Sequence, residues 1–273
     1  MSPGDVLRSA VKMLASGADV VRPAPDGVVV LVYHSVGGAS GLQLDLPKEL
    51  FARQMSELAA SGNVVPLEDA LAQVEQRQPD RGRVSVVLTF DDGTVDFVEH
   101  AVPVLVEHGL PATVYVATAF VEEQRPFDYG TRPLSWSALA DACTTGLVDV
   151  GSHTHTHALL DRVDPAVATD ELDRSIALIE DRLGRPARDF AYPKAVPPSN
   201  AVEAAVRARF RSAALAGTRP NRPGATDPHR LARSPVQAGD GVVWFRRKAA
   251  GGMALEDTLR RLLNRARYAG RDS

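Results

Sequence analysis

The chain has 273 residues, of which 44% are hydrophobic and 24% are charged, and its formal net charge is −3. These values are ordinary for a soluble globular protein, and the length allows one barrel-sized domain with an ample core. The slight negative charge and the absence of a nucleic-acid-binding motif argue against a nucleic-acid binder. The single cysteine, Cys143, excludes a disulfide framework and a thiolate metal cage.

The first 27 residues carry charged side chains at short intervals and contain no apolar run of signal-peptide length. No other segment has the length and apolar character of a membrane span. We therefore expect a cytoplasmic protein in which residues 1–27 form a helical N-terminal extension.

Apolar, β-branched runs then alternate with segments of helical periodicity. The predicted strands lie at residues 28–33, 64–65, 84–90, 112–117, 147–150, 190–192, 213–216 and 231–236. The predicted helices lie between them, at residues 47–61, 67–74, 98–109, from 136 onward, 165–183 and 199–210. Residues 37–41 are predicted as a loop. A second, polar and proline-bounded loop at residues 122–133 is of the kind that overhangs a site.

This alternation predicts an α/β fold, namely a single distorted or incomplete (β/α) barrel of about seven parallel strands over residues 28–243. An open doubly wound sheet is the alternative, but the glycine-rich phosphate loop of its nucleotide-binding versions is absent. Residues 244–273 are predicted as a basic amphipathic helix that packs on the barrel or extends from it. Four of its arginines are Arg260, Arg261, Arg265 and Arg267. They fit a peripheral contact with anionic lipid or, more simply, a solvated helix face.

Carboxylates and imidazoles follow two of the predicted strands. Asp91 and Asp92 come directly after the strand at 84–90. Because adjacent carboxylates repel each other, a cation bound by one of them would leave the other free as a base. His153 and His157 are four residues apart, so a helical turn would direct both to one face, where Asp92 could complete a two-histidine, one-carboxylate metal site. On the same argument His155 points away, to solvent or to a position behind the ligands.

Three motifs, in this order, resemble those of the polysaccharide deacetylase family, also called the NodB-homology or carbohydrate esterase 4 family. They are Thr89-Phe90-Asp91-Asp92-Gly93-Thr94, Ser152-His153-Thr154-His155-Thr156-His157 and Phe190-Ala191-Tyr192-Pro193. The resemblance runs from about Val28 to about Val243. It implies hydrolysis of the N-acetyl group of an amino sugar, with release of acetate, by an enzyme that binds one divalent metal ion. Zn²⁺ is the family's usual ion, and Co²⁺, Ni²⁺ or Mn²⁺ would fit the same ligands.

The resemblance also implies roles for single residues. Asp91 corresponds to the catalytic base, and Asp92, His153 and His157 correspond to the metal ligands. The third motif supplies the oxyanion or substrate contacts, which are the backbone N–H of Lys194 together with Tyr192 and Pro193.

Two features depart from the usual family pattern. The third motif has Ala191 where an arginine often pairs with the base, and Arg233 is the candidate replacement. The usual late leucine–histidine motif is not evident. The early motif Leu31-Val32-Tyr33-His34-Ser35-Val36 instead resembles the poly-N-acetylglucosamine deacetylase branch, in which such a histidine is the general acid. This assigns the general acid to His34.

Several alternatives remain open. Lys194 could contact a phosphate or carboxylate on the substrate, or it could extend into solvent. The same site could hydrolyse a non-sugar amide or an O-acetyl ester. The least favoured alternative is a sugar-binding module without catalysis, because the set of aspartates and histidines is intact. The expected partner is an N-acetylated amino sugar in a polymer, an oligosaccharide, a metabolite, a nucleotide or a lipid.

Overall fold

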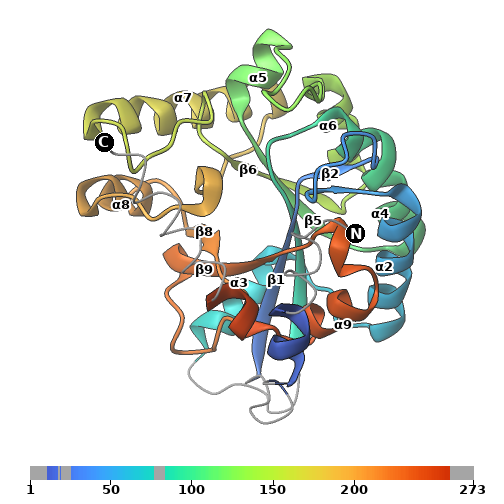
Figure 1. Cartoon of the computed structure of the whole chain (residues 1–273). Helices are drawn as coiled ribbons and strands as arrows, with labels where there is room; N and C mark the ends of the chain where they lie inside the picture. The colour runs from blue at the N-terminus through green and yellow to red at the C-terminus, as the bar shows by residue number, and fades with distance from the viewer. Residues whose placement is uncertain (1–10, 18, 20–25, 77–83, 259–273) are drawn as a thin grey trace, which may run out of the picture.

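The computed structural model describes residues 11–17, 19, 26–76 and 84–258. Within these ranges, seven parallel strands close into a barrel in the order β1-β4-β5-β6-β7-β8-β9 (Figure 1). The strands are β1 (Gly27–Tyr33), β4 (Val84–Phe90), β5 (Ala112–Val116), β6 (Val148–Ser152), β7 (Asp189–Ala191), β8 (Ser212–Ala216) and β9 (Leu231–Pro235). The closed ring confirms the predicted α/β barrel of parallel strands and excludes the open sheet.

The register of the strands brings distant motifs to one rim. β1 and β4 pair along their whole length, from Gly27 with Val84 to Tyr33 with Phe90. β9 closes the ring on β1, where Arg233 pairs with Val30. Because the strands are parallel, the residues that follow their carboxyl ends share one end of the barrel.

Helices surround the barrel on its outside (Figure 1). They are α2 (Lys48–Ser61), α3 (Leu67–Glu75), α4 (Val102–His108), α5 (Thr118–Glu123), α6 (Trp136–Thr144), α7 (Pro165–Leu183), α8 (Asn200–Arg207) and α9 (Val243–Ala249). A π-helical turn, η1 (Phe97–Ala101), leads directly into α4. Their apolar faces pack on strands that are buried on both sides, which explains the nearly continuous apolar runs of β1 and β4.

Five short elements differ from the sequence prediction. β2 (Ser35–Val36) and β3 (Asp45–Leu46) form a two-stranded sheet around the loop predicted at 37–41. α5 precedes and overlaps the start of the segment predicted as a loop, and α9 begins where the barrel domain was predicted to end. The strand predicted at 64–65 is a single bridge between Val64 and Val86. A strand of two residues, or a helix of six or seven, spans at most about two periods of its hydrophobic pattern, so periodicity does not identify it.

The two ends of the described chain are joined by buried charges. Lys12, in a helical segment at residues 11–17, and Lys248 of α9 both pair with Asp240. These three side chains are at most 4% exposed. The Asp19 carboxylate also accepts the backbone N–H of Met253. The segments that flank the barrel therefore pack against each other.

The single C-terminal helix predicted over residues 244–273 is wrong in its first part: α9 ends at Ala249, and the described chain is helical again only from 254 to 258. Residues 259–273, with Arg260, Arg261, Arg265 and Arg267, lie outside the described residues, as do residues 1–10. No helix within the described ranges is long and apolar enough to cross a membrane.

We expect Asp240→Asn to lower the free energy of unfolding by about 3–5 kcal/mol, because two buried ammonium groups would lose their carboxylate partner. Denaturant unfolding measures this difference. Glu57→Gln is the matched control, since it removes a more exposed ion pair with Arg246. The control should cost less than about 1 kcal/mol. Equal effects of the two substitutions would contradict a stabilising role for the buried cluster.

The contribution of Asp240 should also depend on pH. Burial raises the pKa of this carboxyl, but Lys248 and Lys12 lower it more, so the pKa in the folded protein lies below its usual value. Such a group stabilises the fold above its unfolded pKa of about 3.9, and this stabilisation is lost as pH falls through the lower folded value. The stability difference between the native chain and Asp240→Asn should therefore be full at neutral pH and shrink below about pH 4. Urea titrations across this range test the expected sign.

Candidate active site

A tight turn at the end of β4 separates the two adjacent aspartates. The N–H of Asp91 donates to the Tyr33 carbonyl at 3.0 Å and so extends the β1–β4 ladder by one residue. Asp92 and Gly93 then adopt left-handed backbone angles, with φ of 75° and 84°. At Gly93, a Cβ would also approach the side chain of Val116 to 3.1 Å. Aspartate and glycine tolerate this backbone region better than most residues, so the turn can direct two neighbouring carboxylates to different partners.

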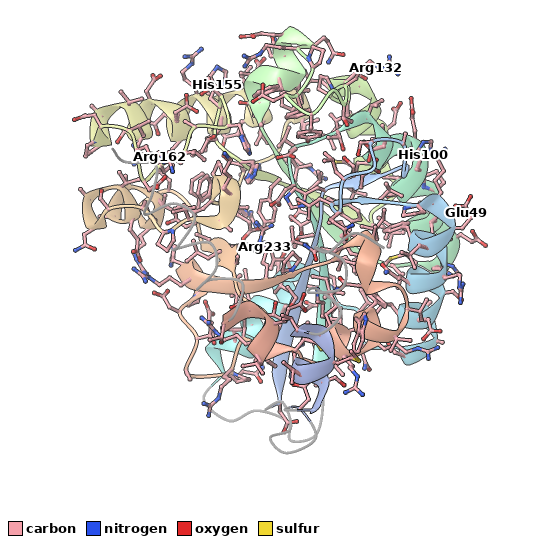
Figure 2. All side chains as sticks on the ribbon, viewed as in Figure 1. Glu49, His100, Arg132, His155, Arg162 and Arg233 are labelled. Atoms are coloured by element: carbon pink, nitrogen blue, oxygen red, sulfur yellow. The ribbon has the colours of Figure 1, made fainter. Side chains whose placement is uncertain are left out.

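Asp91 faces a buried guanidinium. Nη1 and Nη2 of Arg233 donate to Oδ1 and Oδ2 of Asp91 at 2.5 and 2.8 Å. Both residues are at most 4% exposed. Burial raises the pKa of Asp91, but Arg233, followed by His153, lowers it more, so the net pKa lies below its usual value. Arg233 thus keeps Asp91 ionised and fixes the plane of its carboxylate. Figure 2 shows Arg233 toward the centre of the molecule, and its guanidinium carbon lies 5.3 Å from the centre of the Tyr115 ring.

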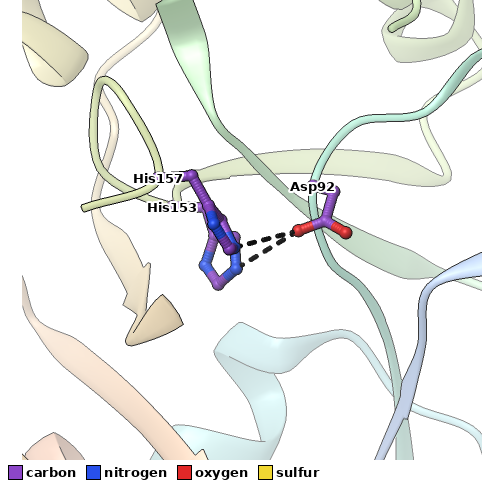
Figure 3. Close-up of side chains that lie close together, drawn as sticks. All are labelled: Asp92, His153 and His157. Atoms are coloured by element: carbon purple, nitrogen blue, oxygen red, sulfur yellow. Dashed lines mark ion pairs between the residues drawn. The ribbon is translucent and has the colours of Figure 1, made fainter. Parts of the chain in front are cut away.

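Asp92 faces two imidazoles. Its Oδ1 lies 3.5 Å from Nε2 of His153 and 3.4 Å from Nε2 of His157, and both interactions converge on this one oxygen (Figure 3). The three candidate ligand atoms lie within 4.8 Å of one another. Asp92 is buried, and although burial raises its pKa, the neighbouring imidazoles lower it more. Two imidazole nitrogens and one carboxylate oxygen that converge in this way form a donor set for a divalent transition-metal ion.

The hydrogen bond and the burial of His153 leave its Nε2 atom unprotonated, as a metal-binding nitrogen must be. Nδ1 of His153 lies 2.7 Å from the carbonyl oxygen of Ala191. A carbonyl can only accept, so Nδ1 carries the proton and the lone pair of Nε2 is directed toward Asp92. Burial, opposed by Asp91 and Asp92, lowers the pKa of His153 to about 4. The imidazole is therefore neutral at physiological pH, which is the form that binds metals.

The backbone at residues 153–157 corrects the sequence prediction of a helical turn. The N–H of His153 still continues the strand ladder, because it donates to the carbonyl of Val116 at 3.0 Å. Thr154 and His157 then have left-handed φ values of 66° and 61°. The His153 and His157 side chains converge because these left-handed residues turn the chain back, and single left-handed residues leave no periodic signal in a sequence.

His155 does not line the cavity and is not exposed to solvent. Its side chain is buried, and its Nδ1 lies 2.9 Å from the hydroxyl of Thr118 in α5. Figure 2 shows His155 beside α5, away from Arg233. The sequence allowed His155 to lie either in solvent or behind the metal ligands, and its burial shows that the expectation of a solvent position is wrong.

His34 follows β1 at the same rim. Its Nε2 lies 4.0 Å from Oδ2 of Asp91, the same oxygen that lies 4.0 Å from Nε2 of His153. The side chain is 26% exposed, whereas Nδ1 is buried without a hydrogen-bond partner. The hydroxyl of Thr94 contacts the His34 carbonyl at 3.4 Å. His34 can therefore reach both the Asp91 carboxylate and a ligand that enters from solvent.

The third motif contributes less to the cavity than the sequence predicted. Tyr192 is buried against Phe190, with ring centroids 4.9 Å apart and nearly perpendicular, and its side chain does not line the cavity. The Pro193 side chain is also buried outside the cavity wall. Lys194 alone of these three reaches the cavity, where it is exposed and has a left-handed φ of 52°.

Most of the predicted site residues line one cavity of about 750 Å³. Its polar wall includes His34, Asp91, Asp92, His153, His157, Lys194 and Arg233. Its apolar wall includes Leu44, Phe120, Phe127, Leu159 and Leu215. The cavity thus brings a carboxylate held by an arginine and a candidate metal site together in one space that also has apolar lining residues.

Tyr129 is a site residue that the sequence analysis did not assign. Its hydroxyl donates to Oδ2 of Asp92 at 2.6 Å, and its ring lines the cavity. The loop at 122–133 was predicted to overhang a site, but no spacing rule distinguishes this tyrosine from the rest of that loop. Burial and the Asp92 charge raise the pKa of Tyr129, so the phenol remains protonated.

Comparisons with known proteins identify relatives of the chain by sequence and by fold. The sequence model of the polysaccharide deacetylase family matches residues 78–213. YxkH of Bacillus subtilis (strain 168), a protein assigned only provisionally as a polysaccharide deacetylase, is 26% identical over 171 residues. This match covers 62% of the present chain and 57% of YxkH, so the chain spans little more than half of that relative.

Solved structures show the same fold. IcaB from Ammonifex degensii is 26% identical, with a TM-score of 0.71 over 83% of this chain and 98% of IcaB. The deacetylase PplD of Streptococcus pyogenes, solved in complex with acetate, is 20% identical, with a TM-score of 0.68 over 81% of this chain and 99% of PplD. The likeness to PplD is one of fold alone.

We expect Arg233→Met to lower the free energy of unfolding by about 3–5 kcal/mol, because it leaves the buried Asp91 carboxylate without its counter-charge. Arg182→Met is the control, since Arg182 forms its ion pairs with Glu122 and Asp181 at the surface. It should cost less than about 1 kcal/mol. The double variant Arg233→Met/Asp91→Asn should recover part of the loss, because the unpaired charge is then removed. Equal effects of the two arginine substitutions in denaturant unfolding would argue against this account.

Proposed function

The chain belongs to the polysaccharide deacetylase family, a family of hydrolases, and we propose that it removes the N-acetyl group from an amino sugar in a metal-dependent reaction. One observation carries the proposal. A convergent set of one carboxylate and two imidazoles shares a cavity with a second carboxylate that an arginine holds ionised. Release of acetate and a free amine from an acetamide needs both a group that polarises the carbonyl and a base for water.

The three convergent residues fit a divalent ion. Asp92, His153 and His157 would hold it, and the proton on Nδ1 of His153 leaves Nε2 free for this purpose. Two imidazole nitrogens and one carboxylate suit Zn²⁺, which we propose as the ion, and they also accept Co²⁺, Ni²⁺ or Mn²⁺. When bound, such an ion supplies Lewis acidity toward the carbonyl oxygen and toward water.

Asp91 is the proposed base. Its carboxylate is ionised, is held through both oxygens by Arg233 and lines the same cavity as the three ligands. In that position it can accept the proton of the attacking water. Arg233 would then act as a positioning residue for the base, in place of the arginine that the third motif lacks.

His34 is the proposed general acid. Cleavage of the amide C–N bond leaves a nitrogen that must gain a proton, and Nε2 of His34 lies 4.0 Å from the Asp91 carboxylate. Its partial exposure would let the imidazole regain a proton from solvent after each turnover.

Lys194 supplies two further proposed contacts. Its backbone N–H would donate to the oxygen on which negative charge develops, and its exposed ammonium group at the cavity would favour a substrate with a phosphate or carboxylate.

The proposal predicts acetate release from N-acetylglucosamine oligomers that requires a divalent metal ion. Asp91→Asn should retain the metal but lower kcat by about 10²–10⁴-fold, because it removes the base. Asp92→Asn should lose both metal and activity, because it removes a ligand. Metal analysis by mass spectrometry, combined with an acetate assay, separates these two outcomes.

Glu57→Gln, on the outer surface of α2, is the control and should leave metal content and turnover unchanged. Equal turnover before and after chelation would refute the metal-dependent proposal. Turnover of an acetyl ester panel without any turnover of N-acetyl sugars would favour the esterase alternative.

A further inference from the structure

We propose that Tyr129 is a positioning residue that makes Asp92 present a single oxygen to the metal ion. The inference depends on the proposed metal site and extends it to a residue outside the three motifs. It concerns the loop between α5 and α6, which carries Tyr129 into the cavity.

The two oxygens of Asp92 have different partners. Oδ1 faces the two imidazoles at 3.4 and 3.5 Å, whereas Oδ2 accepts the Tyr129 hydroxyl at 2.6 Å. A carboxylate oxygen that accepts a short hydrogen bond is a poorer ligand for a cation than its free partner. Tyr129 therefore selects Oδ1 and favours coordination through one oxygen, which leaves more positions on the ion for water and substrate.

The position of the Tyr129 ring is fixed by a stack of aromatic rings. The centroids of Phe120 and Phe127 are 4.5 Å apart, and those of Phe127 and Tyr129 are 5.5 Å apart, with interplanar angles of 8° and 12°. The guanidinium of Arg125 covers the Phe120 ring at 4.2 Å. Phe120 and Phe127 form a small apolar cluster with Ala117, separate from the main core. The phenol is thus presented by a packed unit and not by a freely moving side chain.

The loop backbone is attached to the same turn that carries Asp92. The N–H of Phe127 donates to Thr131 and that of Gly130 donates to Phe127, which closes the loop around Tyr129. At the far end of the loop, the N–H of Leu134 donates to the carbonyl of Gly93 at 3.0 Å. Tyr129 and Asp92 are therefore held in one hydrogen-bonded unit, as expected for a residue that orients a ligand.

Tyr129→Phe tests this inference, because it keeps the ring stack and removes only the hydroxyl. We expect the dissociation constant for Zn²⁺, measured by competition with a chromophoric chelator, to rise by about 10–100-fold. We also expect the visible spectrum of the Co²⁺-loaded protein to change, because the freed Oδ2 can approach the ion. Phe127→Leu keeps the hydroxyl but removes the central ring, and it should produce a smaller rise.

Tyr33→Phe is the matched control. It likewise removes a single phenol hydroxyl, here a buried one that contacts Gln54 of α2 at 3.1 Å on the outside of the barrel. It should leave the Zn²⁺ affinity and the Co²⁺ spectrum unchanged. Thermal unfolding of the metal-free variants shows whether each has retained its fold.

The outcomes separate this inference from the proposed function. If the native chain binds Zn²⁺ and releases acetate, but Tyr129→Phe binds Zn²⁺ within about twofold of the native affinity or more tightly, the inference is refuted and the proposed function stands. If the native chain neither binds a divalent ion nor releases acetate, both are refuted. A rise in the dissociation constant for Tyr129→Phe but not for Tyr33→Phe supports the inference.

Discussion

The buried ion pair between Arg233 and Asp91 is the interaction on which the site depends. Arg233 comes from the last strand of the barrel and Asp91 from the end of the second, and β1 lies between those two strands. Two charges removed from water need a well-matched geometry, and a bidentate contact supplies it. Because β9 and β4 both pair with β1, the pairing of β9 with β1 that closes the ring also brings Arg233 to Asp91.

The rest of the rim also gives each buried carboxylate its own hydrogen-bonding or charged partners. The backbone reverses at Asp92 and Gly93, so that one carboxylate faces a guanidinium and its neighbour faces two imidazoles and a phenol. Like charges that are adjacent in the chain are thereby separated in space, and each has its own partners. The two carboxylates can then perform different chemistry, with one available to hold a cation and the other available to accept a proton.

Sequence reasoning succeeded where the signal was local. Alternating apolar runs and helical segments predicted the barrel, and the ends of β1, β4 and β6 placed His34, Asp91 and His153 at one rim. Arg233 was predicted as the partner of Asp91 because the third motif lacks the arginine that often has this role. The two residues are 142 positions apart in the chain. The prediction of a helical turn at 153–157 was wrong, because it took a four-residue spacing as evidence of a helix. Left-handed angles at Thr154 and His157 produce the same convergence in another way.

The barrel, the family resemblance and the polar residues at the rim could be predicted from the sequence, because strand patterns and motifs are each contained in short stretches. The contacts between particular atoms could not, because they join stretches that are far apart in the chain. The hydroxyl of Tyr129 reaches Asp92 across 37 residues, and Lys12 reaches Asp240 across 228. Neither pair has a spacing that could predict it, because each depends on how the closed barrel directs its loops and joins the segments that flank it.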